Sequence, residues 1–309
     1  MHSINKSVCV LILSFNGKPL LEEALTSYLD NDYENFKVCV IDNGSSDGTE
    51  EYVEKYFPNV QVIRLKKNVG YSGGLNAGLS YAFDENNYDY ALITNNDVKA
   101  DRELVKELVK EADKDEMTGF TIGKVYFYDQ PDTFQTVGKG EDPVRWNGGH
   151  IGNMEIDKGQ YDIPAQRSFC DDIYWLVRRE LYKKTGGYDT TFFLQCEDYD
   201  WQARARKLGY KIMYTPFAKL WHKESMTIGK SSPLKAYYDA RNPVIVIMKH
   251  KTPEFFKKFF WDHFKKNSKP VIKSILKLKP AMAYNIFKGI ASSVIWGLKN
   301  KKLSLRHFI

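Results

Sequence analysis

The sequence predicts an α/β fold with a mostly parallel central sheet that is covered by helices on both faces. β-branched apolar runs alternate with segments of helical hydrophobic spacing through residues 8–113, a pattern typical of such sheets. Polar residues follow several of the apolar runs, among them Asn16, Asp42 and Asp97. Because ligands of these folds collect beyond the carboxyl ends of the strands, we expect a ligand site where these residues meet.

Each expected element follows from its local pattern. The apolar run 8–13 predicts a first strand, and Leu21, Leu25 and Tyr28 recur after it at helical spacing. By the same criteria, strands are expected at 37–41, 60–65, 90–94 and 211–221, and helices at 46–56, 74–83, 102–113, near 178 and at 199–208. Residues 119–170 are rich in Gly, Asp, Thr and aromatic residues, so we expect an irregular, loop-rich segment there.

The composition excludes a disordered chain, because 43% apolar and 14% aromatic residues among 309 can bury a sizeable core. The cysteines show no CxxC or metal-binding spacing, and the N-terminus shows no leader-peptide pattern. We therefore expect free thiols in a reducing, cytoplasmic setting, with Cys9 and Cys39 buried and unreactive. The four positions are Cys9, Cys39, Cys170 and Cys196.

The end of the chain is strongly basic. After His250, 14 lysines and arginines stand against Glu254 and Asp262, whereas the preceding residues hold 31 basic and 37 acidic groups. Phenylalanines recur at helical spacing between lysines in 254–266, and 271–298 continue the pattern. This is typical of a helix at a membrane surface. A helical cap on the rest of the protein and a nucleic-acid patch are the alternatives, and no run is long enough to span a bilayer.

Five motifs at matching separations resemble the inverting glycosyltransferases of family two, in particular the branch that includes bacterial rhamnosyltransferases. They are DNGSSDGT at 42–49, NVGYSGGLNAG at 68–78, NND at 95–97, GGYD at 186–189, and EDYD at 197–200 followed by Arg204 and Gly209. The resemblance covers about residues 8–225 and implies a GT-A fold. It implies a catalytic domain at 1–230, with a nucleotide-binding half at 1–100 and an acceptor-binding half at 101–230, followed by a basic helical region at 231–309.

The resemblance places a nucleotide-sugar donor at the ends of the first strands. Asp42 is expected to accept a hydrogen bond from the imide N–H of uracil or thymine, with Ser14 and Asn16 lining the same pocket. This contact favours a pyrimidine donor, and the resemblance to the rhamnosyltransferase branch implies dTDP-L-rhamnose, followed by the UDP-hexoses. Asp42 as a turn residue is the alternative.

The neighbouring glycine-rich patch is expected to lie beside the donor as well. Asn43 stands where many relatives have a second Asp, which places a ribose contact in question. Gly73 lets the backbone approach the donor, and Asn76 is expected to contact the diphosphate or the sugar. A purely packing role for this patch is the alternative.

A divalent cation, Mn²⁺ or Mg²⁺, is implied by the family's Asp-x-Asp element, whose last carboxylate matches Asp97. Asn95 takes the place of the first Asp, and Asn95 and Asn96 are expected to contact the donor. His222 is expected to act as a second metal ligand that replaces the missing carboxylate. A polar turn at residues 95–97 and a hydrogen-bonded core histidine are the alternatives.

Asp198 matches the family's general base, which takes the proton of the acceptor hydroxyl as it attacks. Glu197 is expected to orient the acceptor or to pair with a nearby Arg. Trp175 is a candidate for sugar contact, although core packing is the favoured alternative for it. A solvated acidic helix start is the alternative for Glu197 and Asp198.

Together these residues predict an inverting glycosyltransferase that acts on a lipid-linked or growing cell-surface polysaccharide. The enzyme is expected in the cytoplasm, at the inner face of the plasma membrane, with residues 250–309 on the anionic surface and no nucleic-acid partner. A degenerate transferase that serves as a binding scaffold is one alternative. A sugar nucleotidyltransferase is another, but its Gly-rich loop with Arg and Lys is absent from residues 14–18.

Overall fold

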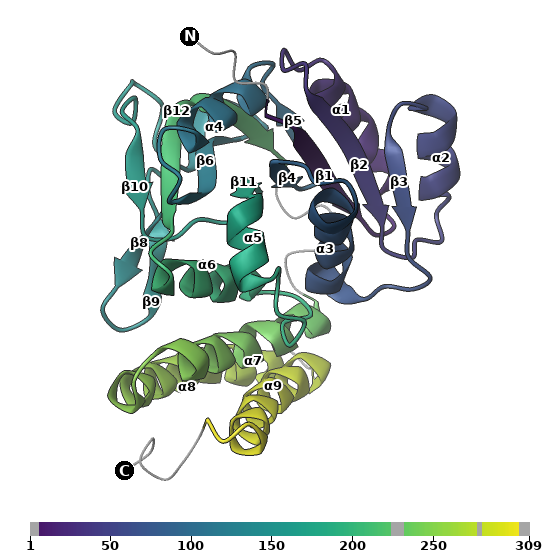
Figure 1. The fold of residues 1–309 in the computed structure, drawn as a ribbon. Helices are drawn as coiled ribbons and strands as arrows, with labels where there is room; N and C mark the ends of the chain where they lie inside the picture. The colour runs from purple at the N-terminus through teal and green to yellow at the C-terminus, as the bar shows by residue number, and fades with distance from the viewer. Residues whose placement is uncertain (1–5, 224–231, 277–279, 303–309) are drawn as a thin grey trace.

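The computed structural model describes residues 6–223, 232–276 and 280–302. In this part of the chain a 10-stranded sheet has the order β10-β12-β6-β11-β4-β1-β2-β3, with β5 paired to β12 and β7 to β6 (Figure 1). Strands β4, β1, β2 and β3 are mutually parallel, as are β12 and β6, while β11 runs antiparallel between β4 and β6. The predicted α/β fold with a mostly parallel sheet is confirmed.

The strands of this sheet are β1 Val8–Ser14, β2 Phe36–Asp42, β3 Gln61–Arg64, β4 Tyr90–Thr94, β5 Val98–Ala100, β6 Thr118–Phe127, β7 Gln130–Thr136, β10 Ala165–Arg167, β11 Tyr174–Arg178 and β12 Lys211–His222. A separate hairpin pairs β8 Lys139–Asp142 with β9 Trp146–His150. The helices are α1 Lys18–Leu29, α2 Thr49–Tyr56, α3 Gly70–Ser80 with the π-helical turn η1 Tyr81–Glu85, α4 Leu104–Ala112, α5 Arg179–Thr185, α6 Glu197–Lys207, α7 Pro233–His250, α8 Pro253–Leu276 and α9 Pro280–Lys299.

Strand β1 shows why the sheet needs helices on both faces. Val8, Val10 and Ile12 belong to the core shared with α1, α2 and α4, whereas Cys9 and Leu11 belong to the core shared with α3, α5 and α6. All five side chains are completely buried. Alternate residues of a strand point to opposite faces, so a strand that is apolar throughout is buried on both faces.

The cysteines of the described chain are free. Cys39 lies in the same core as Cys9, and burial raises the pKa of its thiol to about 12. At neutral pH both thiols are therefore protonated and shielded from reagents. The prediction of buried thiols at these two positions is confirmed.

The prediction of a loop-rich segment at 119–170 is wrong at its start, where β6 forms a long and almost wholly buried strand. Glycines in this stretch suggest a loop, but Gly123 allows close packing between strands instead. A Cβ added to Gly123 would lie 2.1 Å from the carbonyl oxygen of Ala218 on β12. Glycine here permits the close approach of two strands.

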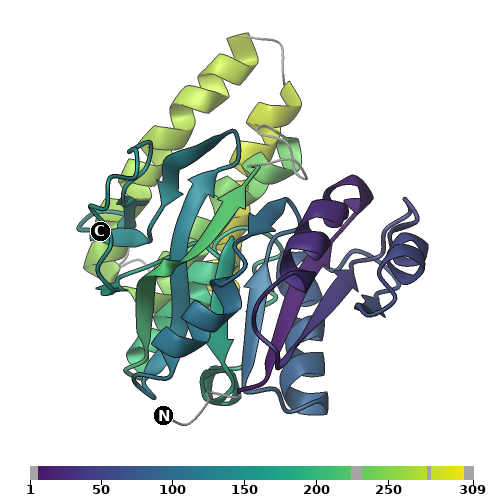
Figure 2. The same cartoon turned by 90° about the horizontal axis from the view of Figure 1, so that it is seen from above.

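Helix α7 joins the C-terminal helices to the rest of the molecule. Its residues 244–248 are buried in one core with Phe192 and with Tyr199 of α6. Helix α9 packs tightly on α7, because a Cβ on Gly289 would lie 2.4 Å from the carbonyl oxygen of Tyr237. Figure 2 shows α8 beside the second half of the sheet, away from β2 and β3. Within the described ranges, no helix is both long and apolar enough to cross a membrane.

The predicted C-terminal helices are present as α8 and α9. Residues 277–279 and 303–309 of the predicted basic region lie outside the described residues, and so does the expected domain boundary at residue 230.

Candidate active site

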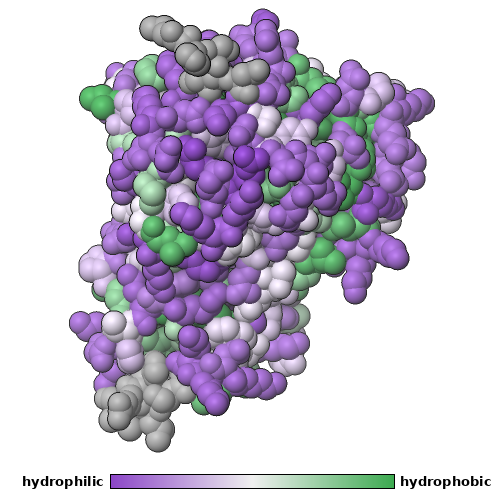
Figure 3. Space-filling view, viewed as in Figure 1, coloured by the Kyte–Doolittle hydropathy of each residue, from purple (hydrophilic) through white to green (hydrophobic). Residues whose placement is uncertain are grey.

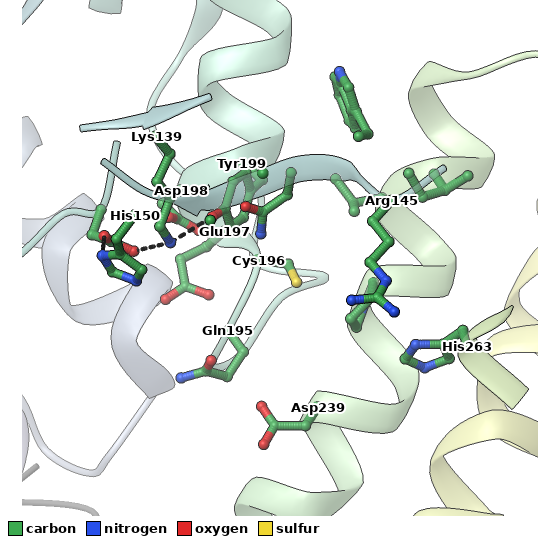
Figure 4. Close-up of a pocket in the computed structure, with 18 of the residues that line it drawn as sticks. Lys139, Arg145, His150, Gln195, Cys196, Glu197, Asp198, Tyr199, Asp239 and His263 are labelled. Carbon is green, nitrogen blue, oxygen red and sulfur yellow. Dashed lines mark hydrogen bonds and ion pairs between the residues drawn. The ribbon is translucent and has the colours of Figure 1, made fainter. Parts of the chain in front are cut away.

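A cleft of about 920 Å³ runs from the end of the sheet to the C-terminal helices. Asn95 and His222 line it where β4 and β12 end, Glu197 and Asp198 line its middle, and Phe259 of α8 lines its far part. Figure 4 shows Glu197 and Asp198 at the start of a helix, with Asp239 and His263 across the cleft from them. The cleft therefore brings predicted metal, acceptor and base residues to one space.

The backbone before α6 is held in an uncommon conformation. Gln195 and Cys196 both have a φ of 70°, in the left-handed region that L-residues rarely adopt. Asn242 of α7 is fully buried and donates hydrogen bonds to the carbonyl oxygens of Leu194 and Gln195, at 2.7 and 2.8 Å. The contact with α7 thus fixes the turn that delivers Glu197 and Asp198 to the cleft.

Asp198 is one of several acids in a buried cluster. Burial and the charge of Asp172 raise the pKa of the Asp198 carboxyl well above its usual range. Burial, Asp172 and Asp198 raise the pKa of Glu197 in the same direction. Burial and the neighbouring Asp171 raise the pKa of Asp172 to about 6. The cluster therefore holds protons that exposed carboxyls would release.

Lys139 supplies a positive charge to this cluster. Its ammonium group forms an ion pair with Asp171 and donates a hydrogen bond to the hydroxyl of Tyr199 at 2.6 Å (Figure 4). His150 Nδ1 lies 3.3 Å from the other oxygen of Asp171. The Lys139 charge lowers the pKa of Asp198, opposing burial. The Lys139 charge therefore favours the ionised carboxylate of Asp198, which is the form that can take up a proton.

His222 and Asp97 meet because β12 pairs with β5, which places His222 opposite Val98. Gln135 Oε1 accepts a hydrogen bond from His222 Nδ1 at 2.8 Å, and this contact turns the other ring nitrogen, Nε2, towards Asp97. Nε2 lies 3.2 Å from Asp97 Oδ1 and 3.5 Å from the amide nitrogen of Asn95.

Two acceptor atoms at 3.2 Å need a proton or a cation between them. Bonds of about 2.1 Å from both atoms to one cation fit this separation. The described chain contains no group of three or more His, Cys, Asp and Glu that could hold a metal ion. A carboxylate oxygen and an imidazole nitrogen are both atoms that Mn²⁺ accepts as ligands, so Asp97 and His222 fit as two ligands of a divalent cation.

The predicted nucleoside residues lie together at the ends of β1 and β2. Asp42 is fully buried, accepts a hydrogen bond from the Ser45 amide at 2.8 Å and pairs with Arg64 at 3.1 Å. Asn16 accepts a hydrogen bond from the Ser46 amide at 2.8 Å. The hydroxyl of Ser14 is buried and has no hydrogen-bond partner among the described residues.

Gly17 lies between these residues and the NND motif, because a Cβ there would lie 2.3 Å from Asn96 Nδ2 and 3.0 Å from Ser14 Oγ. The structure therefore brings Ser14, Asn16 and Asp42 to the sheet edge that also carries Asn95, Asn96 and Asp97.

The glycine-rich patch and the neighbouring Asn43 make their contacts within the protein. The Asn43 amide group donates to the Gly70 carbonyl at 3.0 Å and accepts from the Val69 amide at 3.0 Å. Asn76 donates to the Tyr188 carbonyl and accepts from the Tyr188 amide, both at 2.8 Å. A Cβ on Gly73 would lie 2.9 Å from its neighbour Val69. These contacts favour the packing alternative over donor contact for Asn43, Gly73 and Asn76.

Trp175 is a packing residue. Its side chain has no exposed surface, and its ring stacks on Phe120 at 4.4 Å and meets the edge of Trp201. The candidate contact between Trp175 and a sugar is thus corrected, since a ring without exposed surface cannot reach an acceptor.

Sequence reasoning missed Lys139, Gln135 and Asn242, which act through contacts with residues far along the chain. It also missed Asp171 and Asp172. Two carboxylates directly before the buried strand β11 are a signal that could have found this pair.

Known proteins share this fold. The mannosyltransferase PcManGT from Pyrobaculum calidifontis, solved with GDP-Man and Mn²⁺, matches with a TM-score of 0.56 at 15% identity. The match covers 93% of this chain and 86% of the mannosyltransferase chain. GalNAc-T7, solved with UDP, GalNAc and Mn²⁺, matches with a TM-score of 0.64 at 15% identity over 96% of this chain and 57% of its own. These likenesses show the GT-A fold of glycosyltransferases.

Residues 9–186 match the family described as Glycosyl transferase family 2. The chain belongs to this family.

Two further proteins are similar to this chain in sequence. The poly-beta-1,6-N-acetyl-D-glucosamine synthase of Staphylococcus aureus is 22% identical over 226 residues, which are 72% of this chain and 52% of the synthase. The N-acetylglucosaminyl-diphospho-decaprenol L-rhamnosyltransferase of Mycobacterium tuberculosis is 23% identical over 254 residues, 74% of this chain and 80% of the relative. The chain thus spans about half the length of the synthase.

Proposed function

We propose that this protein is an inverting, metal-dependent glycosyltransferase that moves a sugar from a nucleoside diphosphate to an acceptor hydroxyl. One observation carries the proposal. The cleft that holds the buried carboxylate of Asp198 also reaches His222, whose Nε2 lies 3.2 Å from Asp97 Oδ1. With Asp198 as the base and with His222 and Asp97 beside the diphosphate, the acceptor hydroxyl could displace the nucleoside diphosphate from the sugar in one step.

In the proposed reaction, the acceptor hydroxyl oxygen forms a bond to the anomeric carbon as the bond from that carbon to the diphosphate breaks. The electron pair leaves with the nucleoside diphosphate, and Asp198 takes the hydroxyl proton. Attack opposite the leaving group inverts the anomeric configuration. Glu197 Oε2 is buried without a hydrogen-bond partner among the described residues, so we assign it to a second acceptor hydroxyl.

Asp97 and His222 are proposed to hold Mn²⁺ or Mg²⁺. When bound, the cation would neutralise negative charge that develops on the departing diphosphate. The Mn²⁺ in the two solved glycosyltransferases supports this choice. The hydrogen bond from His222 Nδ1 to Gln135 orients the ring so that Nε2 faces Asp97, where the cation would bind.

The proposed donor is dTDP-L-rhamnose, with UDP-hexoses next. Asp42 supports a pyrimidine, since its Oδ2 has no hydrogen-bond partner among the described residues and can accept from an imide N–H. The rhamnosyltransferase relative favours rhamnose, and the synthase relative favours an N-acetylhexosamine. The proposed acceptor is a lipid-linked glycan at the cytoplasmic face of the plasma membrane, with residues 250–309 towards the lipid.

A thermal-shift comparison of nucleotide sugars with and without Mn²⁺ tests the donor proposal, because a ligand that binds the folded state raises its melting temperature. We expect the largest rise with a dTDP- or UDP-sugar plus Mn²⁺, and a smaller one in His222→Ala. A purine donor that stabilises best would contradict the pyrimidine assignment. Binding without turnover on any acceptor would indicate the scaffold alternative, and formation of a nucleotide sugar from a sugar phosphate would indicate the nucleotidyltransferase.

A further inference from the structure

Helix α8 has an exposed aromatic stripe opposite its packed face. Trp261, Phe264 and Ile272 are 48%, 46% and 57% exposed, whereas Phe259 and His263 are buried. At 3.6 residues per turn, positions 261, 264 and 272 fall on one side of a helix and positions 259 and 263 on the other.

Helix α9 repeats this arrangement. Its exposed side carries large apolar residues, whereas small residues and one isoleucine are buried on the side that faces the other helices. The exposed set is Tyr284 62%, Phe287 70%, Ile295 52% and Leu298 60%, and the buried set is Ile286, Gly289, Ser293 and Gly297. The spacing of three, eight and three residues keeps the exposed set on one face.

Lysines flank both stripes. Lys258, Lys265 and Lys269 are exposed on α8, and Lys288 and Lys299 are exposed on α9. Asp262 pairs with Arg145 at 3.0 Å, which offsets its negative charge. In Figure 3 hydrophilic side chains predominate over α7 to α9, with paler and apolar groups between them. Apolar groups set among cations suit the headgroup boundary of an anionic bilayer better than its interior.

The packed side of α8 lines the far part of the cleft. Phe259, His263, Lys266 and Pro270 contribute to that lining. A single helix therefore borders the acceptor cleft on one side and exposes the aromatic stripe on the other.

We propose that the α8 stripe and the α9 stripe dock on an anionic lipid surface, with the lysines on its headgroups. Docking would bring the far part of the cleft close to a lipid-linked acceptor. The acceptor half of this inference rests on the proposed function, whereas the lipid contact stands on the exposed residues alone.

Vesicle sedimentation with the full-length protein tests the lipid contact. We expect binding to vesicles of equal parts phosphatidylglycerol and phosphatidylcholine, weak binding to phosphatidylcholine alone, and a loss of binding in high salt. Phe264→Ser/Phe287→Ser should bind the anionic vesicles roughly tenfold more weakly. Phe217→Ser is the matched control, because Phe217 is 55% exposed on β12, outside both stripes.

Equal vesicle binding by the wild type, the double variant and the control would overturn the proposal, and so would a wild type that does not bind anionic vesicles. The Mn²⁺-dependent thermal shift with nucleotide sugar, measured on the same samples, separates the two claims. A protein that binds donor but no vesicle contradicts the lipid contact alone. A protein that binds vesicles but no donor contradicts the proposed function alone.

Discussion

Asp198 and Lys139 set the protonation of the site between them. Burial and Asp172 raise the pKa of Asp198, and Lys139 lowers it. A carboxylate with a pKa closer to neutral is a stronger base than an ordinary Asp, provided that it is ionised at the working pH. The buried ammonium group of Lys139 keeps this ionised form accessible.

The first prediction concerns the pH dependence of catalysis. Because the base must be ionised, kcat/KM should rise with pH through the raised pKa of the acid cluster, above the ordinary value of about 3.9. Lys139→Met removes the cation that favours ionised Asp198, so the acid limb should move to higher pH. Lys124→Met is the control, since Lys124 is also buried but pairs with Asp157 and Asp162. A Lys139→Met profile that overlays the wild type would contradict the assignment.

The second prediction concerns Gln135, whose Oε1 accepts a hydrogen bond from His222 Nδ1. Gln135→Leu leaves both proposed ligands in place but removes the group that fixes the ring. Mn²⁺ affinity, measured by titration calorimetry in the presence of dTDP or UDP, should fall by roughly tenfold or more. Asn153→Leu is a nearby control, because Asn153 donates to the Gln135 backbone carbonyl. Unchanged affinity in Gln135→Leu would argue against His222 as a ligand.

At the scale of elements, the contact between α6 and α7 joins the base to the C-terminal helices. Asp200 is fully buried and lies two residues after the proposed base. It accepts a hydrogen bond from Arg204 of its own helix at 2.8 Å and pairs with Lys249 and His250 of α7 at 2.5 and 2.8 Å. Despite burial, these partners hold its pKa well below the usual range. The catalytic turn is thus supported from two helices.

The third prediction is the stability of Asp200→Asn. A depressed carboxyl pKa stabilises the folded state above the unfolded pKa of about 3.9, and this stabilisation is lost as the pH falls through the folded value. Urea unfolding at pH 7 should show a loss of about 3 kcal/mol, which shrinks below about pH 4.

Asp115→Asn is the control for that measurement. Asp115 also has a lowered pKa, mainly from Lys211, but it is exposed. Its loss should cost much less than the loss of Asp200, because ion pairs between exposed groups contribute little to stability. Equal losses in the two variants would show that Asp200 is no more important than a surface ion pair.

The elements that carry Asp42, Asp97 and Asp198 were predictable, because buried parallel strands appear as apolar runs whose ends can be located. The side chains that tune these residues were not predictable. Gln135 meets His222 across 87 positions of the chain, and Lys139 meets Tyr199 across 60. Such contacts depend on the order of strands in the sheet, which the hydrophobic spacing does not specify. Strand β6 was missed because Gly123 permits close packing, a need that only the neighbouring strand reveals.

At the scale of the whole molecule, the order of parts follows the proposed path of the sugar. The proposed pyrimidine-binding residues and the proposed metal ligands lie at the ends of the strands, the proposed base lies at the start of α6, and α8 borders the far part of the cleft. An acidic body with a basic helical end suits an enzyme that faces anionic lipid with one side. The donor would therefore enter from water and the acceptor from the membrane side.

The most direct test of the central claim is the rate of sugar transfer by Asp198→Asn, measured beside its affinity for the donor with Mn²⁺. We expect a rate lower by roughly a thousandfold, because the amide of Asn cannot take the proton. Donor affinity should be unchanged, because the proposed nucleoside-binding residues are not altered. Transfer at the wild-type rate by Asp198→Asn would contradict this claim.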